Sequence, residues 1–107
     1  MKAYGETTDF TALAEPMRRA ILERVAEQPR SVGALAATLP VSRPAVSQHL
    51  RVLKTAGLVS DAAVGTRRVY RLNPAGVAAL RDQLDAFWAR TLSRYHDTVD
   101  HATTEET

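Results

Sequence analysis

The sequence predicts one mainly α-helical domain that carries a small β-hairpin. Apolar residues recur at spacings of three and four over most of the chain, which indicates amphipathic helices. Prolines, serines and an asparagine stand just before these apolar runs, where helices begin. A β-branched and aromatic segment follows a glycine and indicates a strand. The length of 107 residues suits a single domain with a modest core.

Three short helices are expected before the middle of the chain. The first covers residues 8–14, and the second begins at Pro16, where a missing N–H costs nothing, and ends near Gln28. Ser31 is the expected N-cap of the third helix, which ends before Pro40 because a residue preceding proline disfavours helical geometry.

A fourth helix, residues 42–56, carries the most informative side chains. Ser42 is its expected N-cap, and Gly57 stands where a left-handed C-terminal cap belongs. At 100° per residue, three apolar residues fall within about 60° and predict the buried side: Val46, Leu50 and Leu53. The opposite side is polar and basic and has no acid: Pro44, Ser47, Gln48, Arg51, Lys54 and Thr55.

A hairpin and a long helix complete the expected fold. The hairpin strands are 58–61 and 69–72, with a turn at Gly65. The last helix begins at Asn73-Pro74, a cap followed by a proline at the first helical position, and is expected to end near Val99.

The helices and the hairpin together form one unit in this prediction. Residues 1–100 are therefore assigned to the domain. Residues 101–107 lack apolar anchors and are assigned to a disordered tail.

Positive charge is concentrated in residues 41–72. That segment holds six basic residues and one acid, Asp61, a net charge of +5, whereas residues 73–107 carry −3 and residues 1–40 are neutral. A local positive field indicates a polyanionic partner, and a solvated surface without a partner is the alternative. The acidic C-terminal third argues against binding to an anionic membrane.

The composition excludes several classes of protein. The chain has no cysteine, which rules out disulfides, thiolate metal sites and a thiol nucleophile. No apolar run approaches the ~20 residues of a membrane helix, and the N-terminus has no signal-peptide core, so we expect a cytoplasmic protein without a membrane partner. We expect no enzyme, because a glycine-rich phosphate loop is missing and histidines cluster with acids only near the C-terminus.

The third and fourth helices, joined by a very short turn, have the layout of a helix-turn-helix. The polar side of the fourth helix suits a DNA major groove, where Gln48 can pair with adenine and Arg43 or Arg51 with guanine. His49 lies at the flank of this side, so packing within the protein is favoured over a DNA contact, which stays open.

The hairpin turn adds a second basic element. Arg67 and Arg68 stand at its tip, where they can follow phosphates or enter a minor groove, and the alternative is a strand edge guarded by charge. The predicted DNA-binding residues are Ser42, Arg43, Ser47, Gln48, His49, Arg51, Lys54, Thr66, Arg67 and Arg68.

Residues 13–22 and 41–59, followed by hairpin residues 65–72, resemble the ArsR/SmtB family of bacterial repressors. The resemblance covers roughly residues 8–95. It implies a homodimeric winged helix-turn-helix protein that binds double-stranded operator DNA and controls transcription. Family members without metal sites often regulate their own promoters.

Two positions depart from the family pattern. Glu15 precedes the proline of the second helix, where family members often have aspartate, a better cap. Pro40 stands in the helix-helix turn, where they often have glycine, and proline cannot adopt a positive φ. The turn must therefore reach its geometry in another way.

The resemblance also implies that the first and last helices form the dimer interface. The last helix is very apolar for an isolated surface helix, although part of its apolar side must cover its own domain. A two-fold dimer would place two recognition helices about one DNA turn apart, or a multiple of it, each reading half of an inverted repeat. The predicted interface residues are Phe10, Leu13, Leu84, Phe87, Trp88, Leu92 and Tyr95.

Metal sensing, which is common in the family, is weighed as an alternative. The third helix, residues 31–38, lacks the cysteines of one family sensor site. Two pairs on the last helix are four residues apart: His96 with Asp100, and Asp97 with His101. The family's spacing for a second sensor site is not reproduced, so we expect no metal and no cofactor. A metal-responsive repressor, and a winged helix used only for protein interaction, are the alternative functions.

Overall fold

The computed structural model describes residues 10–106, with side chains through residue 102. Residues 10–12 form a helical turn within the expected helix 8–14, whose start lies outside the described residues. The elements that follow are α2 (Pro16–Glu27), β1 (Arg30–Ser31), α3 (Val32–Thr38), α4 (Arg43–Thr55), β2 (Val59–Val64), β3 (Arg67–Leu72) and α5 (Pro74–Glu106).

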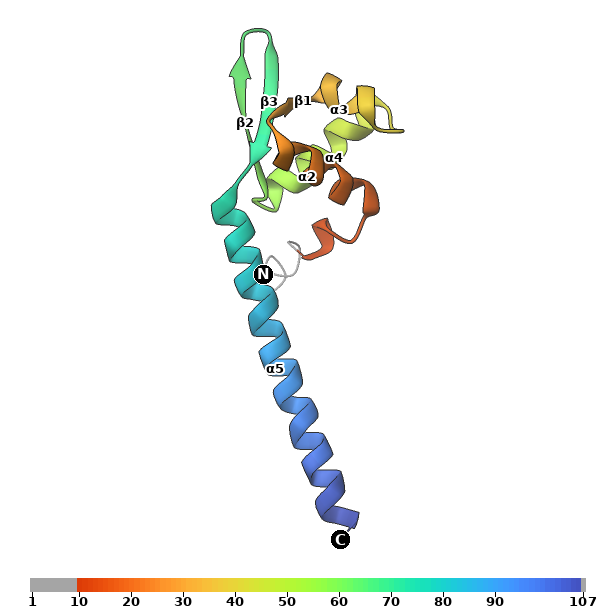
Figure 1. Ribbon diagram of the computed structural model, residues 1–107, viewed down its shortest axis with the longest axis vertical. Coiled ribbons are helices and arrows are strands. Elements are labelled where there is room, and N and C mark those ends of the chain that lie inside the picture. Colours follow the sequence, from red (N-terminus) through yellow and green to blue (C-terminus); the bar gives the residue numbers. More distant parts are fainter. Residues whose placement is uncertain (1–9, 107) are drawn as a thin grey trace.

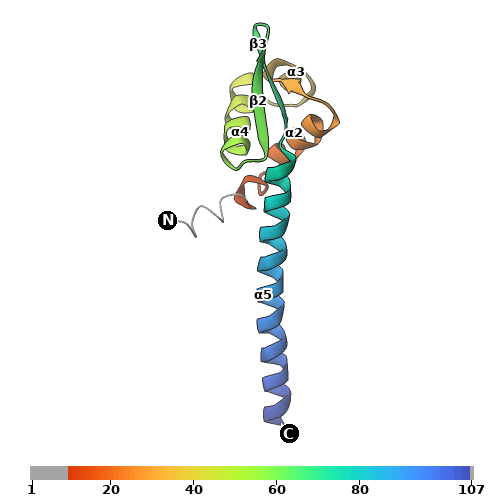
Figure 2. The same ribbon diagram turned by 90° about the vertical axis from the view of Figure 1, so that its left-hand side faces the viewer.

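The molecule has a head and a long rod. Helices α2, α3 and α4 pack with a small sheet to form the head, and α5 leads away from it as one straight helix (Figure 1). The whole measures 70 × 26 × 26 Å. The tip of the β2–β3 hairpin and the far end of α5 lie at opposite ends of the molecule in both views (Figure 2). The hairpin therefore projects from the head as a wing.

The sheet has three antiparallel strands in the order β1-β3-β2. The short strand β1 was not predicted, because two residues give no detectable pattern; Arg30 pairs with Tyr70 and Ser31 with Val69. The wing strands run closer to the turn than predicted, and the turn consists of Gly65 and Thr66. Gly65 has φ +64°, a conformation that favours glycine in a two-residue hairpin turn.

The core lies between the three short helices and the base of the wing. Helix α4 provides Val46, Leu50 and Leu53, each fully buried, which confirms the predicted inner side of this helix. The other buried apolar residues are Ala12, Ile21, Val25, Leu35, Leu58, Val59 and Leu80. Of the α5 side chains that the structure describes, only those at the start of the helix contribute to the core of the head.

The expected helix caps are present. The hydroxyl of Ser31 accepts from the N–H of Ala34 at 3.2 Å, and that of Ser42 accepts from Ala45 at 3.3 Å. Glu15 also caps α2, because its Oε1 accepts from the N–H of Met17 at 2.9 Å. The longer glutamate side chain therefore satisfies a helix-start donor where aspartate is more usual.

Pro40 forms the turn between α3 and α4 without a positive φ. The N–H of Val41 donates to the carbonyl of Leu39 at 2.8 Å, so three residues close a γ-turn centred on Pro40. The inverse form of this turn needs φ near −75° at its centre, which the proline ring favours. Within residues 10–106, positive φ occurs only at Gly57 and Gly65. The helix-turn-helix is thus closed by a proline in place of a glycine.

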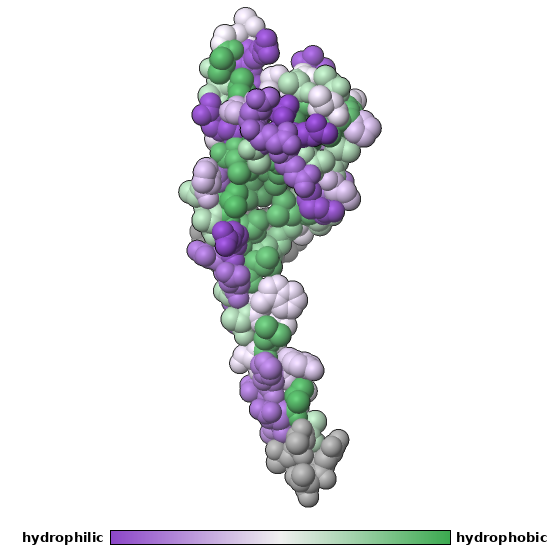
Figure 3. Space-filling view, in the orientation of Figure 1, coloured by the Kyte–Doolittle hydropathy of each residue, from purple (hydrophilic) through white to green (hydrophobic). Residues whose placement is uncertain are grey.

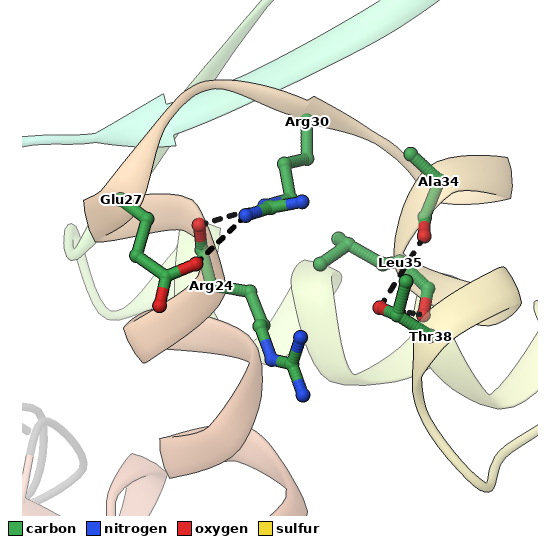
Figure 4. Close-up of polar contacts among 6 residues, drawn as sticks. All are labelled: Arg24, Glu27, Arg30, Ala34, Leu35 and Thr38. Atoms are coloured by element: carbon green, nitrogen blue, oxygen red, sulfur yellow. Dashed lines mark hydrogen bonds and ion pairs between the residues drawn. The ribbon is translucent and has the colours of Figure 1, made fainter.

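Arg30 ties the end of α2 to β1 (Figure 4). Its Nε donates to the carbonyl of Arg24 at 2.8 Å, and its Nη2 lies 2.8 Å from Glu27 Oε1. The carbonyl of Arg24 also accepts from the N–H of Gln28 at 3.4 Å, so this guanidinium adds a second donor at the end of α2. Thr38 similarly donates to carbonyls in its own helix α3, those of Ala34 and Leu35.

The start of α5 is fixed against the end of α4. The Nδ2 of Asn73 donates to the carbonyl of Gly57 at 2.9 Å, and its N–H donates to the carbonyl of Leu58 at 2.9 Å. Gly76 lies so close that a Cβ at this position would stand 1.7 Å from the carbonyl oxygen of Gly57. Glycine at 76 thus allows two backbones to meet, and this junction sets the direction of α5.

Helix α5 is longer than predicted. It continues to Glu106, past the end expected near Val99, and it includes residues 101–106 of the expected disordered tail. The predicted helix end is therefore wrong, whereas the assignment of residues 101–107 to a disordered tail stays a prediction. Once nucleated, a helix extends readily, and residues 100–106 contain no glycine or proline to stop it.

Candidate nucleic-acid interface

The exposed side of α4 carries the residues predicted to contact bases. All of the polar-side residues named from the sequence are exposed: Pro44, Ser47, Gln48, Arg51, Lys54 and Thr55. Arg51 Nη1 donates to Gln48 Oε1 at 3.5 Å, so these two side chains lie together in the middle of the helix. Amide and guanidinium groups side by side on a protruding helix offer the donors and acceptors that base edges require.

An open cleft of about 860 Å³ separates α4 from the wing. Its lining combines Arg43 and Ser47 of α4 with Thr66, Arg67 and Arg68 of the wing. Residues 31–34 at the start of α3 form a third wall, which sequence analysis did not assign to the interface. The tight turn at Pro40 brings the start of α3 beside α4, and a side chain added at Gly33 would meet Arg43 Nη1 at 3.4 Å.

The two wing arginines belong to opposite faces of the hairpin. Side chains alternate along a strand, and the ladder pairs Val64 with Arg67 and Ala63 with Arg68. Arg68 therefore shares the face of Asp61, whereas Arg67 belongs to the other face. Both arginines nevertheless line the cleft beside α4, and their contact with DNA stays a prediction.

Asp61 connects the recognition helix α4 to the wing. Its Oδ1 lies 2.9 Å from Lys54 Nζ, and its Oδ2 lies 3.1 Å from Arg68 Nη1. The Asp61 side chain is only 7% exposed, while those of Lys54 and Arg68 are 57% and 56% exposed. The hydrogen bond from Lys54, together with the charges of Lys54 and Arg68, outweighs partial desolvation and lowers the pKa of Asp61. Two predicted DNA-binding cations thus share one carboxylate.

His49 faces the protein. Its Nε2 lies 3.3 Å from Glu15 Oε2, and the side chain is 19% exposed. Its Nδ1 is buried and has no hydrogen-bond partner among the described residues. This position agrees with the packed interpretation of His49 and places it at the contact between α4 and the start of α2.

The predicted dimer residues on α5 form an exposed apolar stripe: Leu84, Phe87, Trp88, Leu92 and Tyr95, joined by Val99. These six side chains are 41–62% exposed, and they fall within about 140° of the helix circumference. Hydrophobic patches continue from the base of the head down α5 (Figure 3). Phe10 and Leu13, also predicted at the interface, pack against the core and stay partly exposed.

The part of the chain that the structure describes shows neither a cluster of metal ligands nor a membrane-spanning helix. Within residues 10–102, no three His, Asp or Glu side chains converge as metal ligands would, and His96 and His101 lie on the exposed end of α5. No helix of the described chain is both long and apolar enough to cross a membrane.

A helix-turn-helix followed by an antiparallel wing, with an exposed polar recognition helix, defines the winged-helix class of DNA-binding proteins. Comparison with known proteins agrees. Residues 13–61 match the helix-turn-helix domain family. The chain is 63% identical over 91 residues to the HTH-type transcriptional regulator Rv2034 of Mycobacterium tuberculosis, a match that covers 85% of each protein. It is 46% identical over 72 residues to the HTH-type transcriptional repressor SmtB of the same species, covering 67% of this chain and 52% of that protein.

Solved structures give the same result. A possible transcriptional regulator for arsenical resistance is 43% identical, with a TM-score of 0.71 over 84% of this chain and 94% of that one. The homodimeric winged helix-turn-helix domain Mb0332 of Mycobacterium bovis, a possible ArsR-family regulator, is 29% identical, with a TM-score of 0.65 over 88% and 82%. The chain belongs to the ArsR/SmtB family of transcriptional regulators and has its helix-turn-helix DNA-binding domain.

Proposed function

We propose that the protein is a homodimeric repressor that binds a specific inverted repeat in double-stranded DNA and acts in the cytoplasm. The observation that carries this proposal is the exposed polar side of α4, with Gln48 and Arg51 in contact at its centre. A helix of this kind fits the major groove, and its amide and guanidinium groups suit adenine and guanine edges. Repression is supported by the relative named as the repressor SmtB.

The cleft beside α4 suits the phosphate backbone of the same duplex. Arg43 and Arg67 line opposite walls of this cleft, and no ion pair holds either of them within the described residues. Phosphate contacts position a protein on DNA without reading sequence, whereas base contacts provide specificity. We assign Arg67 to a phosphate and Gln48 with Arg51 to bases.

The α5 stripe supports the homodimer. Soluble monomers rarely expose an apolar surface of this extent, and a second copy would cover it in a two-fold arrangement. The related domain of Mycobacterium bovis is described as homodimeric. Such a dimer presents two α4 helices to two half-sites, and the DNA upstream of the protein's own gene is the first candidate operator.

Salt-dependent binding tests the two assigned roles. Arg51→Ala is expected to weaken operator binding by ~1–3 kcal/mol and to leave unrelated duplexes much less affected. Arg67→Ala is expected to weaken binding to every duplex and to reduce the slope of log affinity against log salt by about one. Gel shifts at several salt concentrations measure both effects.

Arg90→Ala is the matched control, because it removes the same charge from the exposed surface of α5. It should leave the salt slope and the preference for the operator unchanged. Equal affinities for the wild type and the Arg51→Ala/Arg67→Ala double variant would contradict the proposal and favour a protein-interaction module.

A further inference from the structure

We propose that Asp61 is a specificity-determining residue, an internal counter-ion that withholds Lys54 and Arg68 from DNA phosphates. The inference rests on the proposed function, because it concerns how the same surface distinguishes an operator from other DNA. Asp61 itself touches no DNA in this proposal. It acts by lowering the positive charge that any duplex meets between the recognition helix and the wing.

The geometry supports this role because cations from two other elements contact the carboxylate of Asp61. Lys54 comes from the last turn of α4, Asp61 from β2 and Arg68 from β3. Asp61 Oδ1 lies 2.9 Å from Lys54 Nζ, and Asp61 Oδ2 lies 3.1 Å from Arg68 Nη1. The side chain of Asp61 is almost buried, whereas the two cationic side chains are more than half exposed. The cations thus cover the acid and form part of the surface that faces solvent.

The cluster of Lys54, Asp61 and Arg68 carries less positive charge than its two cations would carry alone. Two cations that share one anion present one net positive charge, so this cluster attracts a phosphate less than two free cations would. An aspartate is ionised at neutral pH. The hydrogen bond from Lys54 lowers the pKa of Asp61 further in the same direction. A phosphate that approaches Lys54 must compete with an anion already in contact.

Asp61 lowers mainly the affinity of the protein for unrelated DNA. Contacts to phosphates supply nearly all of the affinity of a protein for unrelated DNA, whereas base contacts set the operator apart. Gln48 and Arg51 are not partners of Asp61 and keep their groups available for bases. An internal counter-ion therefore lowers affinity for unrelated duplexes more than for the operator and raises the ratio between them.

The test compares Asp61→Asn with Asp97→Asn, which removes the same charge from the exposed far part of α5. Fluorescence anisotropy measures the affinity for an unrelated labelled duplex at several salt concentrations. Asp61→Asn is expected to bind about tenfold more tightly near 0.1 M salt and to steepen the salt slope by roughly one to two. Asp97→Asn is expected to match the wild type. Adding Lys54→Gln to Asp61→Asn should remove about one unit of the gained slope.

The outcomes separate this inference from the proposed function. If Asp61→Asn keeps the wild-type slope, or binds every duplex more weakly, Asp61 has only a structural role and the inference is overturned. If the wild type binds no duplex in a salt-dependent way, the proposed function itself fails.

A second variant answers the same question if Asp61→Asn does not fold. Asp61→Ser also removes the carboxylate and fits the same space, so it should steepen the wild-type salt slope by roughly one to two. A folded Asp61→Ser protein with the wild-type slope would overturn the inference.

Discussion

Gly76→Ala is expected to destabilise the protein by about 3 kcal/mol and to abolish operator binding. Helix propensity alone predicts the opposite sign, since alanine stabilises a helix by about 1 kcal/mol relative to glycine. The steric repulsion exceeds this gain in helix propensity, because the new Cβ would stand 1.7 Å from the carbonyl oxygen of Gly57. The clash is between backbone segments, which cannot move apart as easily as the end of a flexible side chain. Thermal or urea unfolding measures the change in the free energy of unfolding.

Gly33→Ala provides the matched control for this prediction. Gly33 is also helical, and the three atoms nearest to a Cβ there all belong to the flexible Arg43 side chain, the first of them at 3.4 Å. This variant should be as stable as the wild type or gain up to about 1 kcal/mol. A Gly76→Ala protein at least as stable as Gly33→Ala would show that the α4–α5 junction is not closely packed.

Trp88→Glu is expected to convert the dimer into a monomer and to abolish operator binding with it. Trp88 lies in the middle of the α5 stripe and is 50% exposed, with its ring against that of Phe87 at 5.2 Å between centroids. Loss of a central aromatic side chain commonly costs an interface about 2 kcal/mol or more, and a buried unpaired carboxylate adds to this cost. Light scattering after gel filtration gives the mass in solution.

Ala86→Glu is the control for this substitution. It introduces the same charge on α5, on the side opposite the stripe by helical geometry, and should leave the dimer intact. Trp88 makes no contribution to the buried core of the head, so the Trp88→Glu head should keep its fold. A wild-type protein that is already monomeric, or a Trp88→Glu dimer, would contradict the assignment of the α5 stripe to the dimer.

The sequence predicts the helices well because their signals are local. Ser31, Ser42 and Pro16 fix helix starts through their own hydrogen bonds or ring, and spacings of three and four identify the buried side of α4. The end of α5 was wrong because no breaker residue marks it, and β1 was missed because its two residues pair only through tertiary contact.

The interface was predicted in part. Exposure of the polar side of α4 follows from the helical period, and the structure agrees with it. The pairing of Asp61 with Lys54 and Arg68 depends on how the wing folds back on α4, which no local pattern encodes. The one available signal was that Asp61 is the single acid within the basic segment 41–72.

Selection of bound sequences from a pool of random duplexes tests most directly whether paired α4 helices read DNA. The wild type should select an inverted repeat with half-sites about 10–10.5 base pairs apart, or a multiple of that spacing. Gln48→Ala should lose sequence preference at the same position of each half-site and keep the rest. A motif without two-fold symmetry, or one that Gln48→Ala leaves unchanged, would contradict the account.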